Sequence, residues 1–207
     1  MFGSFNPAIF QPRWLGAQDL IRPEEAETAK ITIIQEDVAD FSTEWFQLQA
    51  FQNRFQLLSE DPRQYAPLRD LAGAIFAILP DTPVTTLGLN RIFHFTMPSV
   101  DSWHGFGHLL APRDLWNPIM EEPGLRSVIM QGRRKQAGGG ALQIKAERSA
   151  MVEHGLYVEV NEEFKAPGDG ESGGARWVPD RLAEHWDAIL NFAEVAADHL
   201  LNLVKNR

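Results

Sequence analysis

Four side chains that can bind a ligand or carry a proton lie close together in the middle of the sequence, between Thr86 and Trp116. They are Asn90, His94, His104 and His108. The same stretch holds three of the six histidines of the chain, among glycines and aromatic residues. Histidine changes its charge near neutral pH and is the commonest metal ligand, so the sequence predicts that any site lies here.

His104 and His108 are spaced i, i+4, which places both rings on one side of a helix. This spacing can hold a metal ion. A zincin also requires a glutamate directly after the first histidine, and Gly105 occupies that position, so a zincin is excluded. The candidates for a third ligand are His94, Asp101 and Asp114, although the spacing requires none of them. The alternative interpretation is that both histidines bond to backbone or solvent beside the apolar face of their helix.

Asn90 and His94 are predicted on one face of a long strand, 84–97, together with Gly88. A polar pair that faces inward can bind a small ligand between a sheet and a helix. Glycine in the strand and in the following helix would permit a close approach of the backbone. The alternative is that this face is solvated, or that its polar groups satisfy one another.

Two other groups of charged residues are interpreted as surface features. Arg133, Arg134 and Lys135 are predicted at the tip of a hairpin. They can bind a phosphate or an acidic partner, but a solvated turn is the preferred interpretation. Glu147, Glu159 and Glu163 are expected on the wet face of a sheet, where charge pairing across strands explains them and an open surface does not favour glycosidase chemistry.

The elements that must position these residues follow from hydrophobic periodicity. Strands are predicted at 30–36, 43–50, 54–60, 84–97, 125–134, 141–148 and 155–164, and helices at 65–79, 103–110 and 179–204, with a short helix that begins at Pro23. Alternating apolar and polar residues in the last three strands are typical of an antiparallel sheet with one buried face. The sequence therefore predicts an α+β fold, with an antiparallel sheet of about six to seven strands, helices on one face and a long C-terminal helix. Two pseudo-twofold βββα halves are a further hypothesis.

The length of the chain fits a single α+β domain over residues 1–207. Residues 1–22 are predicted to form an extended N-terminal arm, because Pro7 and Pro12 argue against a helix. The arm is apolar and is expected to dock on the body of the protein or on a second subunit. Residues 166–175, rich in glycine, are predicted to be a flexible loop.

Charge and composition exclude several classes of function. The net charge is −9, which argues against general nucleic-acid binding, because phosphate contacts require clustered basic residues. The chain has no cysteine, so disulfides, thiol catalysis and cysteine-ligated zinc are excluded. No signal peptide and no apolar stretch of membrane-spanning length is evident, so a cytoplasmic protein without membrane contact is predicted. No nucleotide-binding or cofactor-binding motif occurs, and no cofactor is predicted.

Five segments carry a resemblance to known sequences. They are NPAIFQPRWL, LGLNRIFHF, WHGFGHLLAPRDLW, PGLRSV and YVEVNEEF. Together they resemble a group of uncharacterised bacterial proteins with no assigned function, over most of the chain. The resemblance implies a bacterial protein and carries over no catalytic residue.

The function predicted from these features is that of a non-catalytic cytoplasmic binding or interaction protein. Its partner would be another protein or a small ligand, and the apolar arm and long last helix suggest a homodimer. The alternative is a metal-dependent enzyme that uses His104 and His108.

Overall fold

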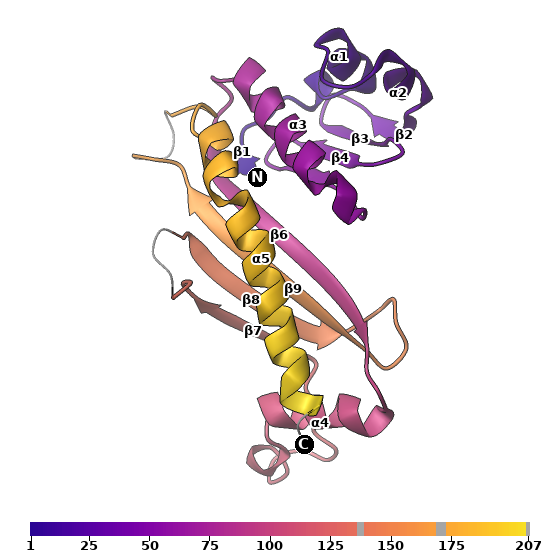
Figure 1. Cartoon of the computed structure of the whole chain (residues 1–207), viewed down its shortest axis with the longest axis vertical. Coiled ribbons are helices and arrows are strands. Elements are labelled where there is room, and N and C mark those ends of the chain that lie inside the picture. The colour runs from indigo at the N-terminus through magenta and orange to yellow at the C-terminus, as the bar shows by residue number, and fades with distance from the viewer. Residues whose placement is uncertain (136–138, 169–172, 206–207) are drawn as a thin grey trace. The chain divides into compact units, whose positions relative to one another are not determined.

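The computed structural model describes residues 1–135, 139–168 and 173–205. In this part the chain is an α+β structure with two antiparallel sheets, of five strands in the order β1-β6-β9-β8-β7 and of four strands in the order β2-β3-β4-β5 (Figure 1). Helix α5, Val178–Lys205, is the long C-terminal helix. The predicted α+β class, with antiparallel strands and a long last helix, is confirmed.

Contacts divide the chain into two compact units. Unit 1 comprises Met1–Leu87 and Phe164–Trp186, and unit 2 comprises Gly88–Glu163 and Asp187–Arg207. Strands β6 and β9 and helix α5 pass from one unit into the other. Among the residues that the structure describes, no helix is sufficiently long and apolar to span a bilayer.

Unit 1 contains the four-stranded sheet and the helices that the chain forms before β6. Its elements are β1 (Phe2–Gly3), α1 (Pro12–Ala17), α2 (Pro23–Thr28), β2 (Lys30–Ile34), β3 (Val38–Ser42), β4 (Gln47–Phe51), β5 (Phe55–Leu58) and α3 (Tyr65–Ile78). Strand β3, which has Asp40 at its centre, is not among the strands predicted from the sequence. The amides of Gln47 and Gln49 donate to the Asp40 carboxylate at 2.9 and 2.8 Å, and these bonds offset the poor strand propensity of aspartate.

The N-terminal residues 1–22 are more regular than the sequence predicts. They contain β1, a single 3-10 turn at Pro7–Ile9 and α1, and Pro12 is the first residue of α1, where a proline is tolerated. Phe5, Phe10 and Leu15 are buried within unit 1. The Phe10 ring lies 4.9 Å from that of Phe55, between ring centroids. The apolar side chains of the predicted arm are therefore part of the core of the chain itself.

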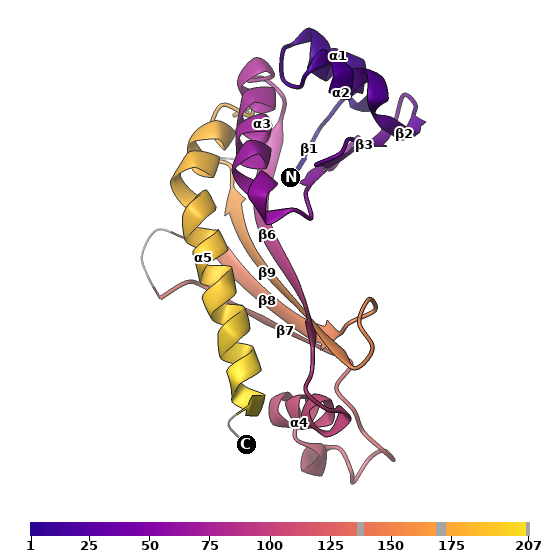
Figure 2. The same ribbon diagram turned by 45° about the vertical axis from the view of Figure 1, so that its right-hand side comes forward.

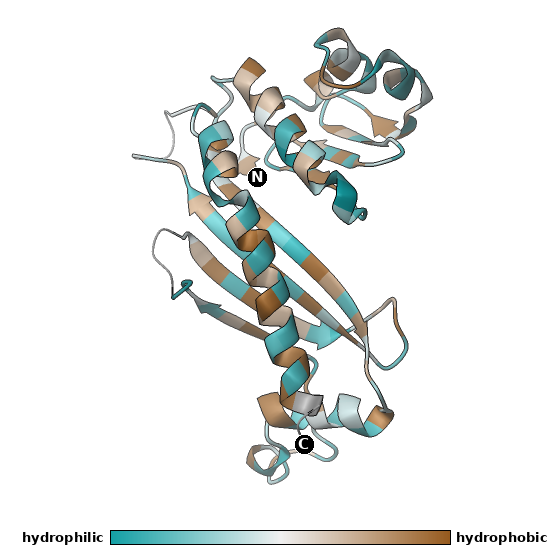
Figure 3. Cartoon of the chain, in the orientation of Figure 1, coloured by the Kyte–Doolittle hydropathy of each residue, from teal (hydrophilic) through white to brown (hydrophobic). Residues whose placement is uncertain are grey.

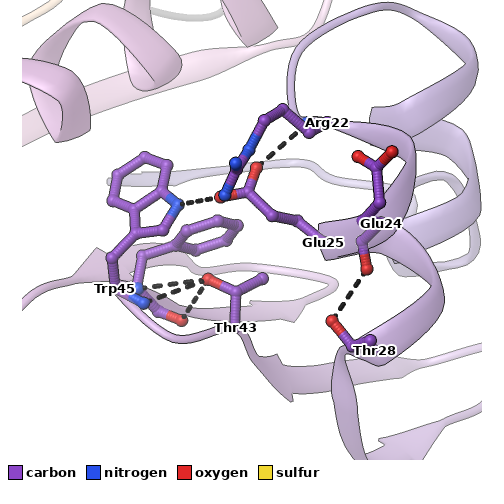
Figure 4. A network of polar contacts seen from close by, with 7 residues as sticks. Arg22, Glu24, Glu25, Thr28, Thr43 and Trp45 are labelled. Carbon is purple, nitrogen blue, oxygen red and sulfur yellow. Dashed lines mark hydrogen bonds and ion pairs between the residues drawn. The ribbon is translucent and has the colours of Figure 1, made fainter.

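A polar network connects α2 to the four-stranded sheet of unit 1 (Figure 4). Glu25 accepts hydrogen bonds from the Arg22 guanidinium at 3.0 Å and from the Trp45 indole at 3.1 Å. Glu25 also accepts from the backbone N–H of Arg22, which completes a capping box at the start of the helix. Burial would raise the pKa of the Glu25 carboxyl, but these hydrogen bonds outweigh burial and lower it.

Unit 2 is a sheet with one apolar and one polar face. Its elements are the main part of β6 (Val84–Thr96), α4 (Val100–Leu110), β7 (Ser127–Gly132), β8 (Ala141–Arg148), most of β9 (Gly155–Lys165) and the second part of α5. Strands β7, β8 and β9 pair in an unbroken antiparallel register. Leu156, Val158 and Val160 of β9 are buried, and Ile189 and Ala193 of α5 are buried as well. Helix α5 lies along this sheet in both views (Figure 1, Figure 2).

Hydropathy alternates along these strands, and α5 carries a broken hydrophobic stripe (Figure 3). The three predicted strands 125–134, 141–148 and 155–164 are thus found as β7, β8 and β9. Five strands, β1 to β5, precede α3, whereas three, β7 to β9, lie between α4 and α5, and the pseudo-twofold relation stays a prediction. Residues 136–138 of the glycine-rich hairpin tip and residues 169–172 of the predicted flexible loop 166–175 lie outside the described residues.

Candidate functional site

Asn90 and His94 lie on the polar face of the unit 2 sheet, as their spacing in β6 predicts. The neighbouring strand β9 contributes Tyr157, Glu159 and Asn161 to this face. Asn90 is exposed, and His94 is half-buried. Gly88 makes room for the amides, because a Cβ at this position would lie 3.1 Å from Asn161 Oδ1 and 3.6 Å from Asn90 Nδ2.

His94 forms a hydrogen bond that the sequence does not predict. Its Nδ1 lies 2.8 Å from the hydroxyl oxygen of Ser149. That oxygen also accepts from the backbone N–H groups of Met151 at 3.1 Å and Val152 at 3.0 Å. Since two backbone donors occupy its lone pairs, the hydroxyl is placed to donate its proton to His94 Nδ1.

This serine–histidine pair is not arranged for nucleophilic attack. A nucleophilic serine needs a free lone pair and an adjacent base that takes its proton. Both lone pairs of Ser149 are occupied by backbone donors, and its side chain is buried. The geometry instead fixes the chain between β8 and β9, with His94 as the acceptor.

Tyr157 and three charged residues form a closed set of contacts on the same face. The Tyr157 hydroxyl donates to Glu159 at 2.8 Å, Lys145 Nζ lies 5.4 Å from the centroid of the Tyr157 ring, and Lys145 pairs with Glu147 at 2.7 Å. Burial, together with the hydrogen bond to Glu159, raises the pKa of Tyr157. Tyr157 therefore stays neutral at physiological pH and cannot act as a base.

His104 and His108 lie on the same side of α4, as predicted. Their ring centroids are 6.4 Å apart. His104 is exposed and its ring contacts that of Trp103, whereas His108 Nε2 is buried without a hydrogen-bond partner. Burial lowers the pKa of His108, and the nearby charges of Arg113 and His104 lower it further, so this ring is neutral near pH 7.

The four predicted site residues come from two different elements. Asn90 and His94 belong to the polar sheet face, and His104 and His108 belong to α4. Within residues 1–135, 139–168 and 173–205, no three histidine, aspartate or glutamate side chains gather closely enough to hold a metal ion. A metal bound by His104 and His108 would have to complete its coordination with ligands from outside this set.

The most deeply buried charges of unit 2 are not predicted by the sequence. Glu162 is 0% exposed, and its carboxylate accepts from the Arg134 guanidinium at 3.0 Å, while the Arg134 side chain is 6% exposed. The backbone N–H of Gly140 donates to the same oxygen at 3.0 Å. Arg134 is therefore not part of a solvated turn, and that interpretation of the basic cluster is wrong for this residue.

A signal for this ion pair is present in the sequence. Glu162 falls on the even-numbered, apolar face of β9, in phase with Val158 and Val160. A charged residue in phase with core residues needs a buried partner of opposite charge. A side chain at Gly139 would collide with the Glu162 carboxylate, so the glycine there lets the hairpin close over the pair.

Comparison of the chain with protein-family models, with curated proteins and with solved structures finds no match. The resemblance to a group of uncharacterised bacterial proteins stays a prediction. Function has to be inferred from the contacts and surfaces of the two units.

Proposed function

We propose that this chain is a non-catalytic interaction protein of the cytoplasm, which binds a protein partner through an exposed apolar turn of unit 2 and is itself a homodimer. The observation that carries the proposal is the turn that follows α4. Its exposed apolar residues are Leu115, Trp116, Ile119 and Met120, and Leu115 and Ile119 are each 70% exposed. An isolated exposed leucine is ordinary, but four large apolar side chains within six residues indicate a binding surface.

The backbone of this apolar turn, residues 113–120, is ordered by its own hydrogen bonds. The N–H groups of Trp116 and Asn117 donate to the carbonyl of Arg113 at 2.8 and 2.9 Å. The N–H groups of Ile119 and Met120 donate to the carbonyl of Trp116 at 2.9 and 3.1 Å. A partner that binds here would not have to order the backbone, which lowers the entropic cost of association.

A small pocket adjoins the apolar turn. It has a volume of about 190 Å³ and is lined by Ala111, Trp116, Met120, Pro123, Gly124, Leu125 and Arg126. A pocket of this size accepts one apolar or aromatic side chain of a partner, and tryptophan and methionine are enriched where proteins bind one another. The pocket is too small for a typical cofactor.

The contacts of the histidines give less support to an enzyme. Ser149 is fully engaged by backbone donors, Tyr157 is held neutral, and His104 and His108 have no third ligand among the described residues. Elemental analysis of protein purified without a histidine tag separates the two functions. A stoichiometric metal that is lost on substitution of His104 and His108 by alanine would favour the metal-dependent enzyme.

The interaction is tested by gel filtration of extracts from cells that naturally make the protein. We expect the wild-type chain to elute in a complex larger than a homodimer, and the double variant Leu115→Ser, Ile119→Ser to elute no larger than a homodimer. Met151→Ser is the matched control, because Met151 is an exposed apolar residue elsewhere in unit 2. If the wild-type and the double variant elute alike, the apolar turn is not the binding surface.

A further inference from the structure

Strand β7, Ser127–Gly132, forms one edge of the five-stranded sheet. Among the described residues the strand pairs with β8 along one side only, and it is the last strand in the sheet order. Five of its six residues are exposed, including Ile129 at 51% and Met130 at 65%. Half of the N–H and C=O groups of such a strand point away from its sheet and can pair with another strand.

The sequence of β7 lacks the devices that usually protect an edge. Proteins discourage edge-to-edge pairing with lysine, proline or a β-bulge on the exposed strand. Strand β7 reads SVIMQG, with no charged residue and no proline. Its register with β8 is continuous over all six residues, so no bulge twists it away from a partner.

We infer that β7 pairs with β7 of a second copy of the chain, antiparallel, about a two-fold axis that passes through Ile129. This inference rests on the homodimer of the proposed function and specifies its interface. When two copies of a strand pair about a two-fold axis perpendicular to the sheet, a residue before the axis lies opposite the residue equally far after it in the other copy. Side chains that share a face in one copy then continue that face in the other. With the axis at Ile129, Val128 lies opposite Met130 of the second copy, and Ser127 lies opposite Gln131.

The side chains match best in this register. Ile129 faces its own copy on one face of the extended sheet, with the polar pair Ser127 and Gln131 on either side. On the other face, two pairs of Val128 and Met130 meet. Apolar and β-branched side chains opposite one another are the pairs that stabilise a sheet.

The neighbouring registers match less well. Moving the axis to Met130 would place Ile129 opposite Gln131 and Ser127 opposite Arg133, so the apolar Ile129 side chain would face an amide instead of its own copy. Moving it to Val128 would leave only three residues of each strand paired, which is fewer hydrogen bonds for the same entropic cost.

The interface is small, so the dimer is expected to be weak. Five residues from each strand bury less than the roughly 1,200 Å² of a standard interface, and we expect a Kd of about 1–100 µM. Association therefore has to be measured at protein concentrations above this range.

Single cysteine variants test both the partner and the register, because the chain has no cysteine of its own. Residues directly opposite in an antiparallel pair have Cα atoms about 4.5–5.5 Å apart, within the range of a disulfide. We expect Ile129→Cys to form a disulfide-linked dimer on mild oxidation. Gln131→Cys lies on the same exposed strand, but its Cα atoms would be about 14 Å apart, and we expect no disulfide.

A mixture sharpens the test. Ser127→Cys and Gln131→Cys should each stay unlinked alone and should form a mixed disulfide together, because Ser127 lies opposite Gln131 only in this register. Linkage of Met130→Cys without linkage of Ile129→Cys would overturn the register. A wild-type chain that is a dimer by light scattering, with no linkage at Ile129→Cys, would overturn the β7 interface but not the homodimer.

A wild-type chain that stays a monomer by light scattering at about 300 µM, a concentration above the expected range of Kd, would overturn the homodimer and this inference together. Binding of a different protein through the apolar turn would still be decided by the gel filtration experiment. Circular dichroism of each cysteine variant checks its fold, and the exposed positions chosen should not perturb it.

Discussion

Strands β2 and β7 are both exposed edge strands, one in each unit, and both present apolar side chains to solvent. Ile31 of β2 is 59% exposed, which is comparable to Ile129 and Met130 of β7. The two strands differ in charge and in regularity. Strand β2 begins with Lys30, and its register with β3 shifts between Ile31 and Ile33, whereas β7 is uncharged and pairs without interruption.

This difference shows that exposed apolar residues alone do not identify a strand that can pair. A bulge displaces the outward N–H and C=O groups from the regular spacing that a second strand requires, and a lysine at the edge must be desolvated. Strand β2 has both features. Strand β7 has neither, and this difference supports the pairing that we propose for it.

The two edges are also anchored differently. The end of β7 is followed by Arg134, which forms the buried ion pair with Glu162. The start of β2 follows α2, which is held by the pair of Arg22 and Glu25, and the Arg22 side chain is 72% exposed. A buried pair depends strongly on both partners, whereas a solvated pair contributes little.

The largest expected effect on stability is therefore that of removing the buried ion pair of Arg134 and Glu162, which follows β7. Glu162→Ala should lower the free energy of unfolding by about 3–5 kcal/mol, because it leaves Arg134 buried without a counter-charge. Glu25→Ala should cost about 1 kcal/mol, since Arg22 remains hydrated. Urea denaturation followed by circular dichroism measures both.

Two controls separate the ion pair from the side-chain volume. Arg133→Met, at the exposed neighbour of Arg134, should leave stability unchanged. Replacing Arg134 and Glu162 together by methionine should restore most of the lost stability, because no unpaired charge then remains. Equal losses for Glu162→Ala and Glu25→Ala would remove the distinction between the two anchors.

A smaller effect is expected for a charge introduced at the centre of each edge. Ile129→Lys should raise the Kd of the homodimer about 30-fold or more, because two lysines would face one another and apolar contact would be lost. Ile31→Lys should leave the Kd unchanged, since β2 takes no part in the interface. Sedimentation equilibrium measures both, and a weaker dimer in Ile31→Lys would show that β2 also pairs.

The fold could be predicted from the sequence where periodicity is long and strict. Strands β8 and β9 and helix α5 are found within one or two residues of their predicted bounds, because alternation and the helical stripe leave one consistent choice. Strand β3 is not among the predicted strands. It carries Asp40 at its centre, and its stabilisation comes from glutamines on the next strand. A contact of this kind is tertiary and leaves no local signal.

The candidate site was predictable only in part, for the same reason. The i, i+4 spacing correctly predicts that His104 and His108 share one side of a helix. The partner of His94 is Ser149, which is 55 residues away, and no spacing rule links the two. The position of Glu162 on the apolar face of β9 indicates from the sequence alone that this carboxylate needs a buried partner. It does not indicate that the partner is Arg134.

The smallest expected effect is a difference in acid sensitivity between the regions beside the two edges. His108 lies in α4. This helix contacts the segment just before β7: a Cβ built on Gly107 would lie 3.6 Å from the Cβ of Leu125, two residues before the strand begins. With its pKa lowered from 6.5, His108 takes up a proton more readily in the unfolded chain, so its contribution to stability is complete above pH 6.5 and is lost as the pH falls. Glu25, whose pKa is lowered from 4.5, stabilises α2 until the pH falls below that value.

Hydrogen exchange at pH values of about 7.5, 6 and 5, corrected for intrinsic rates, compares the two regions on one sample. We expect α4 to lose protection first, while α2 and β2 keep theirs throughout this range. His108→Gln should remove the early loss, and His104→Gln, at the exposed histidine of the same helix, should retain it. A variant without His108 that still loses protection in α4 before α2 would assign the acid sensitivity to another group, because an amide at this position cannot be protonated in this range.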